Sequence, residues 1–441
     1  MFRFCGRTLV CALAVGLLAI PAASAQLYVD CSGNTPGAFT TINSALPMLQ
    51  NGGSLIVTGN CSENVTLANL NNIYFGADWS LKAGLAGTLT IADSQQIFVY
   101  GLTVASPTGN GIAVANSREV NINVCALNGN AGNGLNVDLG SVVSIGESGS
   151  FDDNGAPGIS VGGNSYLSLV PWGGSIDISN NVDAGIYATR GEVDGLGNIT
   201  ISNNKLTPNS LAVSGFGVDM RGAAKGFLLG IFGPTTITQN QSGGISMQEG
   251  SELSLAGGAL FTNGYPTMID GNGPIGVSVG FGSQVTFYYG VQVSDHTSVG
   301  VDVYANSQAY INGDNQITHN GTGNDPARAG LRLDGNSEAF VRGGTITQNG
   351  GPGMLALMNS SFDFSGVAFS GNGGGAMVCD TSSWISTDLP GLATARMSGG
   401  ACRMPHTLGI RRHLYTSIRP PDVSRLRALA DRWRKLTSQT H

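Results

Sequence analysis

A parallel β-helix, which is a stack of short coils that each contain three strands, is the fold that this sequence predicts. The first observation is a glycine followed by an alternating apolar segment, which recurs every 23 to 32 residues. The second is composition: 67 of 441 residues are Gly and only 11% are charged, and such a chain disfavours helical bundles because Gly weakens helix interiors. The repeat glycines are Gly111, Gly134, Gly158, Gly185, Gly217, Gly244, Gly276, Gly300, Gly330 and Gly353.

An asparagine four residues before the repeat glycine is the third observation. Asn tolerates the left-handed backbone of a tight corner, and stacked Asn side chains can form a hydrogen-bonded ladder along the axis. Asn372 keeps the spacing before Ala376, and His296 takes the Asn position before Gly300. The other members are Asn130, Asn154, Asn181, Asn240, Asn272 and Asn349.

The repeat length sets the content of one coil. Period-two alternation after each corner places one face of a strand inward and the other outward, and 22 to 32 residues accommodate three short strands with three turns. A coil cannot bury its own inner face, so stacked neighbours supply the core. Weaker segments upstream, such as 89–91 and 97–99, bring the total to about a dozen coils in a single-stranded solenoid. The insertions 205–215, 257–266 and 321–329 should project as loops.

These repeats resemble those of the secreted right-handed parallel β-helix proteins of the pectin-lyase-like superfamily, in particular its bacterial β-helix-repeat group. The resemblance covers residues 27–402 and implies an amphipathic helix that caps the N-terminal mouth of the solenoid. Residues 40–49 fit such a helix, because Ile42, Ala45, Leu46 and Leu49 follow helical spacing. Pro47 should shorten or kink it.

The chain ends differ from the repeat region. Residues 1–25 have the positive start, apolar stretch and Ala23-Ser24-Ala25 site of a secretory signal, so we expect a secreted, periplasmic or cell-surface protein without a transmembrane segment. The predicted organisation is a signal peptide at 1–25, an N-terminal cap and first coils at 26–88, repeats at 89–402 and a basic tail at 403–441.

Five cysteines remain after the predicted cleavage, and an oxidising compartment allows them to pair. Cys31 and Cys61 flank the first structured segment, and Cys379 and Cys402 flank the last repeat. We therefore predict these two disulfides and a buried thiol at Cys125. No Cys/His spacing indicates zinc, and no cofactor is expected.

Charge is distributed unevenly along the chain. The formal net charge of the whole chain, −7, argues against nucleic-acid binding. Residues 26–402 contain 10 Lys and Arg against 26 Asp and Glu, a balance of −16. Residues 403–441 contain 9 basic and 2 acidic residues, a balance of +7, and carry an apolar stripe of helical period. This tail could bind an anionic surface, cap the C-terminal mouth of the solenoid, or have no role, and the sequence leaves these three interpretations open.

No complete catalytic motif of the polysaccharide-cleaving β-helix enzymes is present. Galacturonan hydrolases of this fold carry Asn-x-Asp, Asp-Asp, Gly-His-Gly and Arg-x-Lys; here Asp152-Asp153 is the sole Asp-Asp pair, and neither of the last two motifs follows it. The position of the pair directly before Asn154 favours a turn. Calcium-dependent lyases need clustered carboxylates with a basic residue nearby, and basic residues are scarce in 26–402.

Outward positions two and four residues after the repeat glycine form columns along one sheet. Two spots in these columns carry charged and aromatic side chains, and the residues between them are small. These spots could bind sugar, with tyrosines stacking on rings and charged groups holding hydroxyls or carboxylates, or they could be cross-strand ion pairs on an exposed sheet. The candidate residues are Tyr187, Asp219, Arg221, Asp302, Tyr304, Arg332 and Asp334.

Three functions follow from these observations. The first is an exported, non-catalytic solenoid that binds polysaccharide or a cell-surface glycan, which the missing motifs favour. The second is a carbohydrate-active enzyme, a lyase or hydrolase of an acidic glycan, which the charged columns keep open. The third is a structural or adhesive role without glycan affinity.

Overall fold

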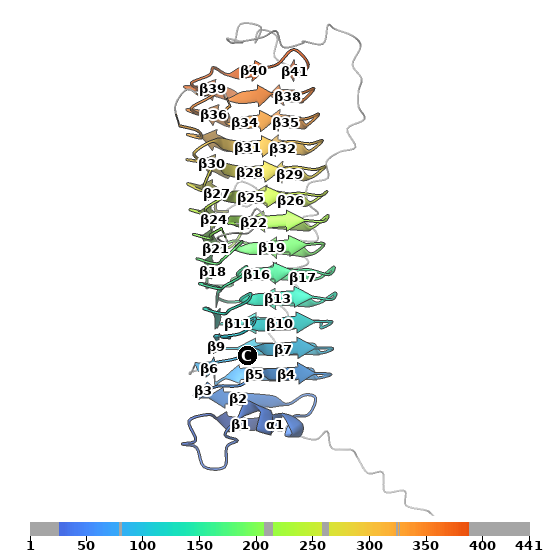
Figure 1. Cartoon of the computed structure of the whole chain (residues 1–441), viewed down its shortest axis with the longest axis vertical. Coiled ribbons are helices and arrows are strands. Elements are labelled where there is room, and N and C mark those ends of the chain that lie inside the picture. The colour runs from blue at the N-terminus through green and yellow to red at the C-terminus, as the bar shows by residue number, and fades with distance from the viewer. Residues whose placement is uncertain are drawn as a thin grey trace, which may run out of the picture. The chain divides into compact units, whose positions relative to one another are not determined.

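Three parallel sheets wind around a common core in the computed structural model, which describes residues 26–78, 82–206, 215–257, 264–322, 325 and 327–387. Sheet A has fifteen strands among these residues, and sheets B and C have thirteen each. The chain visits sheets A, B and C in turn, so each strand pairs with the equivalent strand one coil away (Figure 1). The sheet C strands run to the right on the near side of Figure 1 as the chain rises, which is the right-handed sense. The predicted parallel β-helix is confirmed.

The strand bounds show how evenly the coils repeat. Sheet A contains β1 (Gln26–Asp30), β2 (Ser54–Thr58), β5 (Asn71–Ala77), β8 (Gln95–Tyr100), β11 (Val120–Asn123), β14 (Val142–Ile145), β17 (Tyr166–Leu169), β20 (Glu192–Gly195), β23 (Lys225–Leu229), β26 (Glu252–Ala256), β29 (Gln284–Phe287), β32 (Gln308–Asn312), β35 (Glu338–Arg342), β38 (Ser361–Ser365) and β41 (Trp384–Thr387). Sheet B contains β3 (Asn60–Cys61), β6 (Ala83–Leu85), β9 (Leu102–Val104), β12 (Cys125–Leu127), β15 (Gly149–Ser150), β18 (Ile176–Ser179), β21 (Ile199–Ser202), β24 (Thr235–Thr238), β27 (Thr267–Asp270), β30 (Val291–Ser294), β33 (Gln316–Thr318), β36 (Thr345–Thr347) and β39 (Ala368–Ser370). Sheet C contains β4 (Val65–Ala68), β7 (Leu89–Ala92), β10 (Ile112–Ala115), β13 (Leu135–Asp138), β16 (Ile159–Val161), β19 (Ile186–Thr189), β22 (Phe216–Arg221), β25 (Gly243–Met247), β28 (Ile275–Val279), β31 (Val299–Val303), β34 (Leu331–Leu333), β37 (Met354–Ala356) and β40 (Met377–Cys379).

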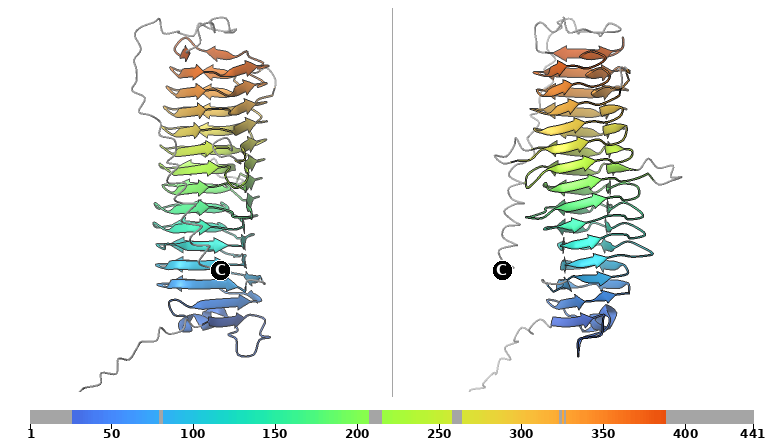
Figure 2. Two further views of the ribbon diagram at one scale, coloured as in Figure 1. Left: turned by 180° about the vertical axis from the view of Figure 1, so that it is seen from behind. Right: turned by 90° about the vertical axis from the view of Figure 1, so that its left-hand side faces the viewer.

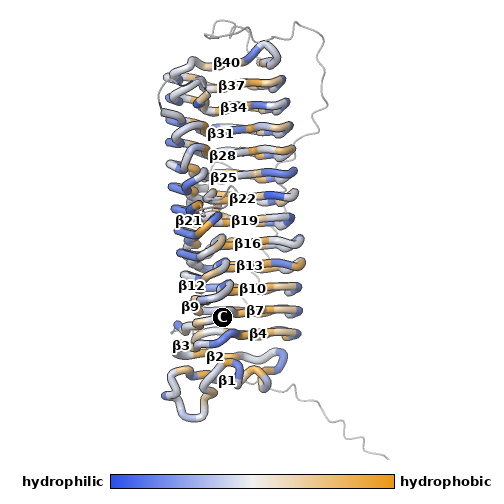
Figure 3. Tube along the Cα trace, in the orientation of Figure 1, coloured by the Kyte–Doolittle hydropathy of each residue, from blue (hydrophilic) through white to orange (hydrophobic). Residues whose placement is uncertain are grey.

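One continuous core runs along the axis from Val29 to Ile385. At inward positions of sheet C, identical or similar apolar residues stack on successive coils: Val114 pairs with Val137, which pairs with Val161. Figure 3 shows the result as apolar strand segments on successive coils, joined by more hydrophilic turns, and Figure 2 shows the same stacking from two other sides. Alternation of the side chains across each strand therefore supplies the core, as the period-two pattern predicts.

The N-terminal helix is much shorter than the sequence predicts. α1 spans Ile42–Ala45 and is followed by a 3-10 turn, Leu46–Met48, with Pro47 near its start. Glu63 accepts hydrogen bonds from the backbone N–H groups of Ile42 (2.6 Å) and Asn43 (3.0 Å) at the start of α1. Ile42 and Ala45 are buried in the core, but one turn of helix does not confirm the predicted capping helix over 40–49. Pro47 removes a backbone donor and stops the helix early.

The predicted asparagine ladder is present at the turns from sheet B to sheet C. From Asn130 to Asn272 and again from Asn320 to Asn372, the Asn Nδ2 donates to the Oδ1 of the Asn on the next coil at 2.8–3.0 Å. The same Oδ1 also accepts from a backbone N–H of the preceding coil, as between Asn154 and Asn181 (3.1 Å). The repeat glycine is required by the ladder, because a Cβ on Gly185 would lie 2.8 Å from Asn204 Nδ2 and 2.7 Å from the Gly217 carbonyl.

Two ladder members, Asn204 and Asn320, do not follow the predicted spacing. Both are fully buried and hydrogen-bonded to their neighbours in the ladder. The insertions at 205–215 and 321–329 separate each of them from its repeat glycine, Gly217 and Gly330. The ladder position is therefore kept from coil to coil, while the loop that follows it varies in length.

A second ladder, built from serines, lies at the turns from sheet C to sheet A and is not among the features predicted from the sequence. Backbone N–H groups donate to the serine Oγ of the next coil, for example Ser117 to Ser141 (3.2 Å) and Ser141 to Ser165 (3.1 Å). The signal was available, since most of these serines follow the repeat glycine by seven residues. The ladder members are Ser94, Ser117, Ser141, Ser165, Ser251, Ser283, Ser307, Ser337 and Ser360.

His296 occupies the asparagine position of one coil and is buried. Its Nε2 lies 3.1 Å from the Ile269 carbonyl, and its backbone N–H donates to Asn320 Oδ1 at 3.3 Å. Burial lowers the pKa of His296, and contacts with the carbonyls of Asn272 and Ile269 and the charge of Asp270 offset part of this effect. The imidazole is therefore neutral in the folded protein at neutral pH.

This histidine should make the fold acid-sensitive. Below the ordinary pKa of 6.5, the unfolded chain binds a proton here that the folded chain does not, so stability is lost as the pH falls, by at most about 1.4 kcal/mol per pH unit. His296→Asn should flatten this dependence and extend the ladder. Urea unfolding at pH 7.5 and 5.0 measures it, with the exposed His319→Asn as control. Equal pH dependence in the wild type and His296→Asn would contradict the prediction.

The cysteines follow the predictions as far as the structure describes them. Cys31 and Cys61 form a disulfide, with Cα atoms 5.2 Å apart. Cys125 is a buried free thiol whose pKa burial raises to about 12. Cys379 is disulfide-bonded, and its predicted partner Cys402 lies outside the described residues, as do the signal segment 1–25 and the tail 403–441. None of the helices in the described residues has the length and apolar character needed to span a bilayer.

Candidate functional site

The candidate residues lie on or beside the outer face of sheet C. The register places four of them in one column, and Arg221, Tyr304 and Asp334 lie two residues further along their coils. Tyr187 pairs with Asp219, and Asp302 pairs with Arg332 on the following coil. Between these two spots the column contains only Ser246 and Ser278. The outer face of β19 to β34, called the sheet C strip below, is therefore two charged spots with a floor of small residues between them.

Asp302 and Arg332 form an ion pair between adjacent coils. The carboxylate accepts from Arg332 Nε and Nη2, both at 2.7 Å, which is a bidentate contact. Asp302 is 3% exposed, whereas the arginine side chain is 30% exposed. Burial raises the pKa of Asp302, and Arg332 offsets only part of that rise. The carboxylate thus fixes the guanidinium, and it is the guanidinium that reaches solvent.

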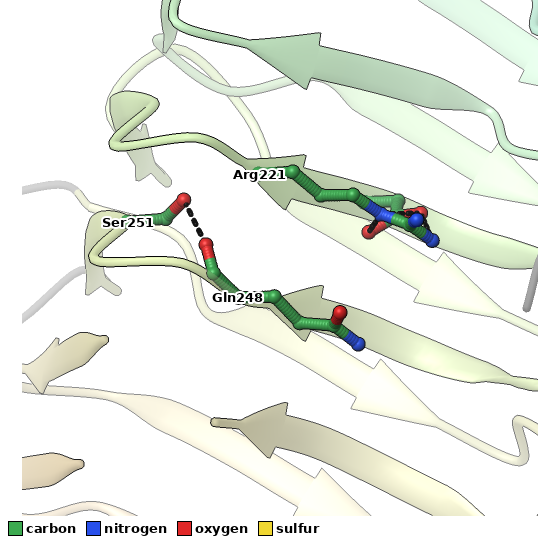
Figure 4. A network of polar contacts seen from close by, with 4 residues as sticks. Arg221, Gln248 and Ser251 are labelled. Atoms are coloured by element: carbon green, nitrogen blue, oxygen red, sulfur yellow. Dashed lines mark hydrogen bonds and ion pairs between the residues drawn. The ribbon is translucent and has the colours of Figure 1, made fainter. Parts of the chain in front are cut away.

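Asp219 and Arg221 repeat this arrangement within one strand. Arg221 donates from Nη2 to Asp219 at 2.8 Å, with a longer contact from Nε at 3.2 Å. Asp219 is 2% exposed, and burial raises its pKa, while Arg221 and Ser246 act in the opposite direction. Figure 4 shows Arg221 and Gln248 extending the same way from neighbouring strands, so the amide of Gln248 extends this charged spot.

The three remaining candidates differ in what they offer. Tyr304 rests on Gly280, where a Cβ would lie 2.3 Å from the ring, and it meets Phe281 edge-on at 5.6 Å. Asp334 Oδ1 is buried and has no hydrogen-bond partner within the described residues. Tyr187 is half-buried beside Asp219. The structure therefore brings Asp302, Arg332 and Asp334 into one spot, while the Tyr304 ring lies over the preceding coil.

The acidic members of the columns are not exposed, although they face outward as the alternation predicts. Asp219 and Asp302 lie beneath their arginines. The prediction that these columns expose side chains of both charges is therefore wrong for the two aspartates, which are buried. The reason is side-chain length: a short carboxylate on a sheet between small neighbours is covered when a long guanidinium folds onto it. Phe281, an exposed residue with a positive φ of 54° beside Tyr304, carried no sequence signal that distinguished it.

In the structure, the side chains of two other candidate sites are occupied by structural contacts. Asp153 adopts the left-handed conformation of a turn, and Asp152 accepts hydrogen bonds from Ser179 (2.7 and 2.9 Å), which confirms the turn interpretation. Cys31, Cys61 and Glu63 are close enough together to surround a metal ion. Their two sulfurs are joined in the disulfide, however, and Glu63 binds the start of α1, so no thiolate remains to ligate a metal.

Comparison with known proteins gives similarity to solved structures alone: no family model and no curated protein matches the chain. The A-module of the mannuronan C-5 epimerase AlgE6 from Azotobacter vinelandii is 17% identical, with 79% of this chain and 93% of that chain covered and a TM-score of 0.36. The A-module of AlgE4 from the same organism is 15% identical, with 81% and 94% covered and a TM-score of 0.38. Pectate lyase Pel9A is 11% identical, with 78% and 79% covered and a TM-score of 0.32.

These identities and TM-scores say nothing about the activity of this chain. The architecture agrees with the resemblance to the pectin-lyase-like superfamily on independent grounds, namely three parallel sheets and an asparagine ladder that only His296 interrupts between Asn130 and Asn372. Function must therefore be argued from the side chains of the sheet C strip.

Proposed function

We propose that this protein is an exported, non-catalytic β-solenoid that binds a polysaccharide along the sheet C strip. Two arginines, Arg221 and Arg332, each held by a buried aspartate on the same sheet face, are the observation that supports this function most directly. Orienting a guanidinium in advance lowers the entropy cost of binding a hydroxyl or carboxylate oxygen. The disulfide between Cys31 and Cys61 fits an oxidising compartment and thus export.

The spacing of the two arginines suits an extended polymer. Arg221 is the last residue of β22 and Arg332 lies in β34, four coils later, which corresponds to about 19 Å at the usual strand spacing. In the column that contains Asp219 and Asp302, the positions between the two spots are the short side chains of Ser246 and Ser278. A chain lying along the axis could reach both guanidiniums.

A co-sedimentation experiment tests this function. The protein is incubated with polygalacturonate, alginate and a neutral xylan, with and without calcium, and bound protein is quantified. We expect binding to at least one polymer and an affinity at least tenfold lower for the double variant Arg221→Ala/Arg332→Ala, because both oriented donors are lost.

Arg342→Ala is the matched control. Arg342 also forms an inter-coil ion pair, with Asp363 (2.8 Å), but on sheet A and with a partly exposed aspartate. The affinity of Arg342→Ala for the polymer should stay within twofold of the wild type. An equal loss of affinity in Arg342→Ala and in the double variant would contradict a binding site on sheet C. Absorbance from unsaturated products in the same incubation would instead indicate a lyase. If the protein binds none of the polymers, the proposed function is wrong and a structural role is favoured.

A further inference from the structure

A polar trough on the N-terminal coils lies outside the sheet C strip. It is a cavity of about 410 Å³ at the turns from sheet C to sheet A of three successive coils. Its lining residues are Asn69, Leu70, Asn71, Asp93, Ser94, Gln95, Asn116 and Arg118.

The trough is shaped by the left-handed turns and the start of the serine ladder. Asn69, Asp93 and Asn116 have φ values of 58°, 50° and 46°, so the same turn conformation recurs one coil above the other. Ser94 lies at the base, where its Oγ accepts the Leu70 N–H at 3.1 Å. Three turns spaced by one coil span roughly 10 Å, which is about the length of two sugar rings.

The side chains of the trough offer both donors and acceptors. Asn116 Nδ2 donates to Asp93 Oδ1 at 2.7 Å, which holds these two walls together. The other amides, on Asn69, Asn71 and Gln95, each carry a donor and an acceptor, which matches a hydroxyl group that needs both. The set is suited to a polyhydroxylated ligand.

Arg118 gives the trough its charge preference. Within the described chain its exposed guanidinium makes no side-chain hydrogen bond or ion pair, although the region 26–402 has a balance of −16. An unpaired arginine among acidic surroundings is complementary to one carboxylate, which it can bind in bidentate fashion. The carboxylate of Asp93 in the same trough disfavours a multiply charged anion such as phosphate.

We propose that this trough binds a uronic acid unit of a polysaccharide, with its carboxylate on Arg118 and its hydroxyls on Asp93 and the amides. The site is independent of the sheet C strip, from which it is separated by several coils. It would act as a second point of attachment on the same solenoid, so that a long acidic chain engages the protein at two places.

Isothermal titration with trigalacturonate as the probe tests the proposal. The wild type should bind trigalacturonate, and its affinity should fall as the salt concentration rises. The Arg118→Ala variant should bind at least tenfold more weakly than the wild type. Hydrogen exchange should show protection of residues 69–71, 93–95 and 116–118 when the trisaccharide is present. Maltotriose, which has no carboxylate, should bind more weakly than trigalacturonate.

Arg190→Ala is the matched control, because Arg190 is an exposed arginine at the same kind of turn but outside the trough. It should bind trigalacturonate like the wild type. The double variant of the sheet C strip should also retain this binding, which separates failure of the trough from failure of the proposed function. Unchanged affinity in Arg118→Ala, or competition by inorganic phosphate as strong as by trigalacturonate, would overturn the proposal.

Discussion

Replacing Asn181 by alanine is expected to lower the free energy of unfolding by about 4 kcal/mol, a loss typical of a broken buried hydrogen-bond network. Asn181 is fully buried and its side chain takes part in four hydrogen bonds. Its Nδ2 donates to Asn204 Oδ1 (3.0 Å) and to the Phe151 carbonyl (2.7 Å). Its Oδ1 accepts from the Asn154 backbone N–H (3.1 Å) and from Asn154 Nδ2 (2.8 Å). Alanine leaves the backbone N–H and Nδ2 of Asn154 on the preceding coil without this acceptor, and it removes one of two donors to Asn204 Oδ1, which still accepts from the backbone N–H of residue 181 (3.0 Å).

Asn180→Ala is the control for the ladder, measured by urea unfolding alongside Asn181→Ala. Asn180 adopts a left-handed conformation (φ 58°) and makes only a 3.5 Å contact with Ser179. Its replacement should cost about 1 kcal/mol, because the short polar side chain of Asn tolerates the left-handed conformation better than that of Ala. Equal losses in the two variants would show that turn conformation, and not the ladder, dominates the stability of this corner.

Removing the Cys31–Cys61 disulfide should destabilise the N-terminal end by about 3 to 4 kcal/mol. The bond closes a loop with a sequence separation of 30, and the unfolded chain gains that loop's entropy when the bond is absent. Because coils of a solenoid contact only their neighbours, we expect the loss to appear first in β1 and α1. The double variant Cys31→Ala/Cys61→Ala is measured by thermal melting and by hydrogen exchange.

Cys125→Ala is the matched control for this variant. Cys125 is also buried but carries a free thiol, so its loss removes packing without opening a loop. Its effect should be about 1 kcal/mol and should not increase exchange in β1. Faster exchange throughout the solenoid in the disulfide variant, without a preference for the N-terminal end, would contradict the local effect.

The ladders show how far sequence periodicity reaches into this fold. Where the Asn-to-Gly spacing is regular, as from Asn130 to Gly134, the pattern predicts the buried side chain correctly. At Asn204 and Asn320 an insertion intervenes, and the spacing no longer identifies the ladder member. The ladder itself continues because hydrogen bonds depend on the distance between coils, and an insertion that leaves the corner does not alter that distance.

For the candidate site too, the sequence predicts some features and not others. Alternation and the repeat glycine correctly predict that Asp302 lies opposite Arg332, since parallel register follows from equal coils. The burial of Asp302 and Asp219 depends on how a long side chain folds over a short one, which no pattern of residues records. The N-terminal trough is also absent from the pattern, because its walls come from three turns that are close only after the coils stack.

Local periodicity therefore established the coil, the strand directions and the polar corners, because each depends on neighbours in the chain or on an equal neighbour one repeat away. The stacked structure decided which polar groups are covered, where the short helix α1 ends and which turns enclose a cavity. These depend on contacts between side chains of unequal length on different coils. Burial in a solenoid is a property of three or more coils together, and a single repeat does not contain it.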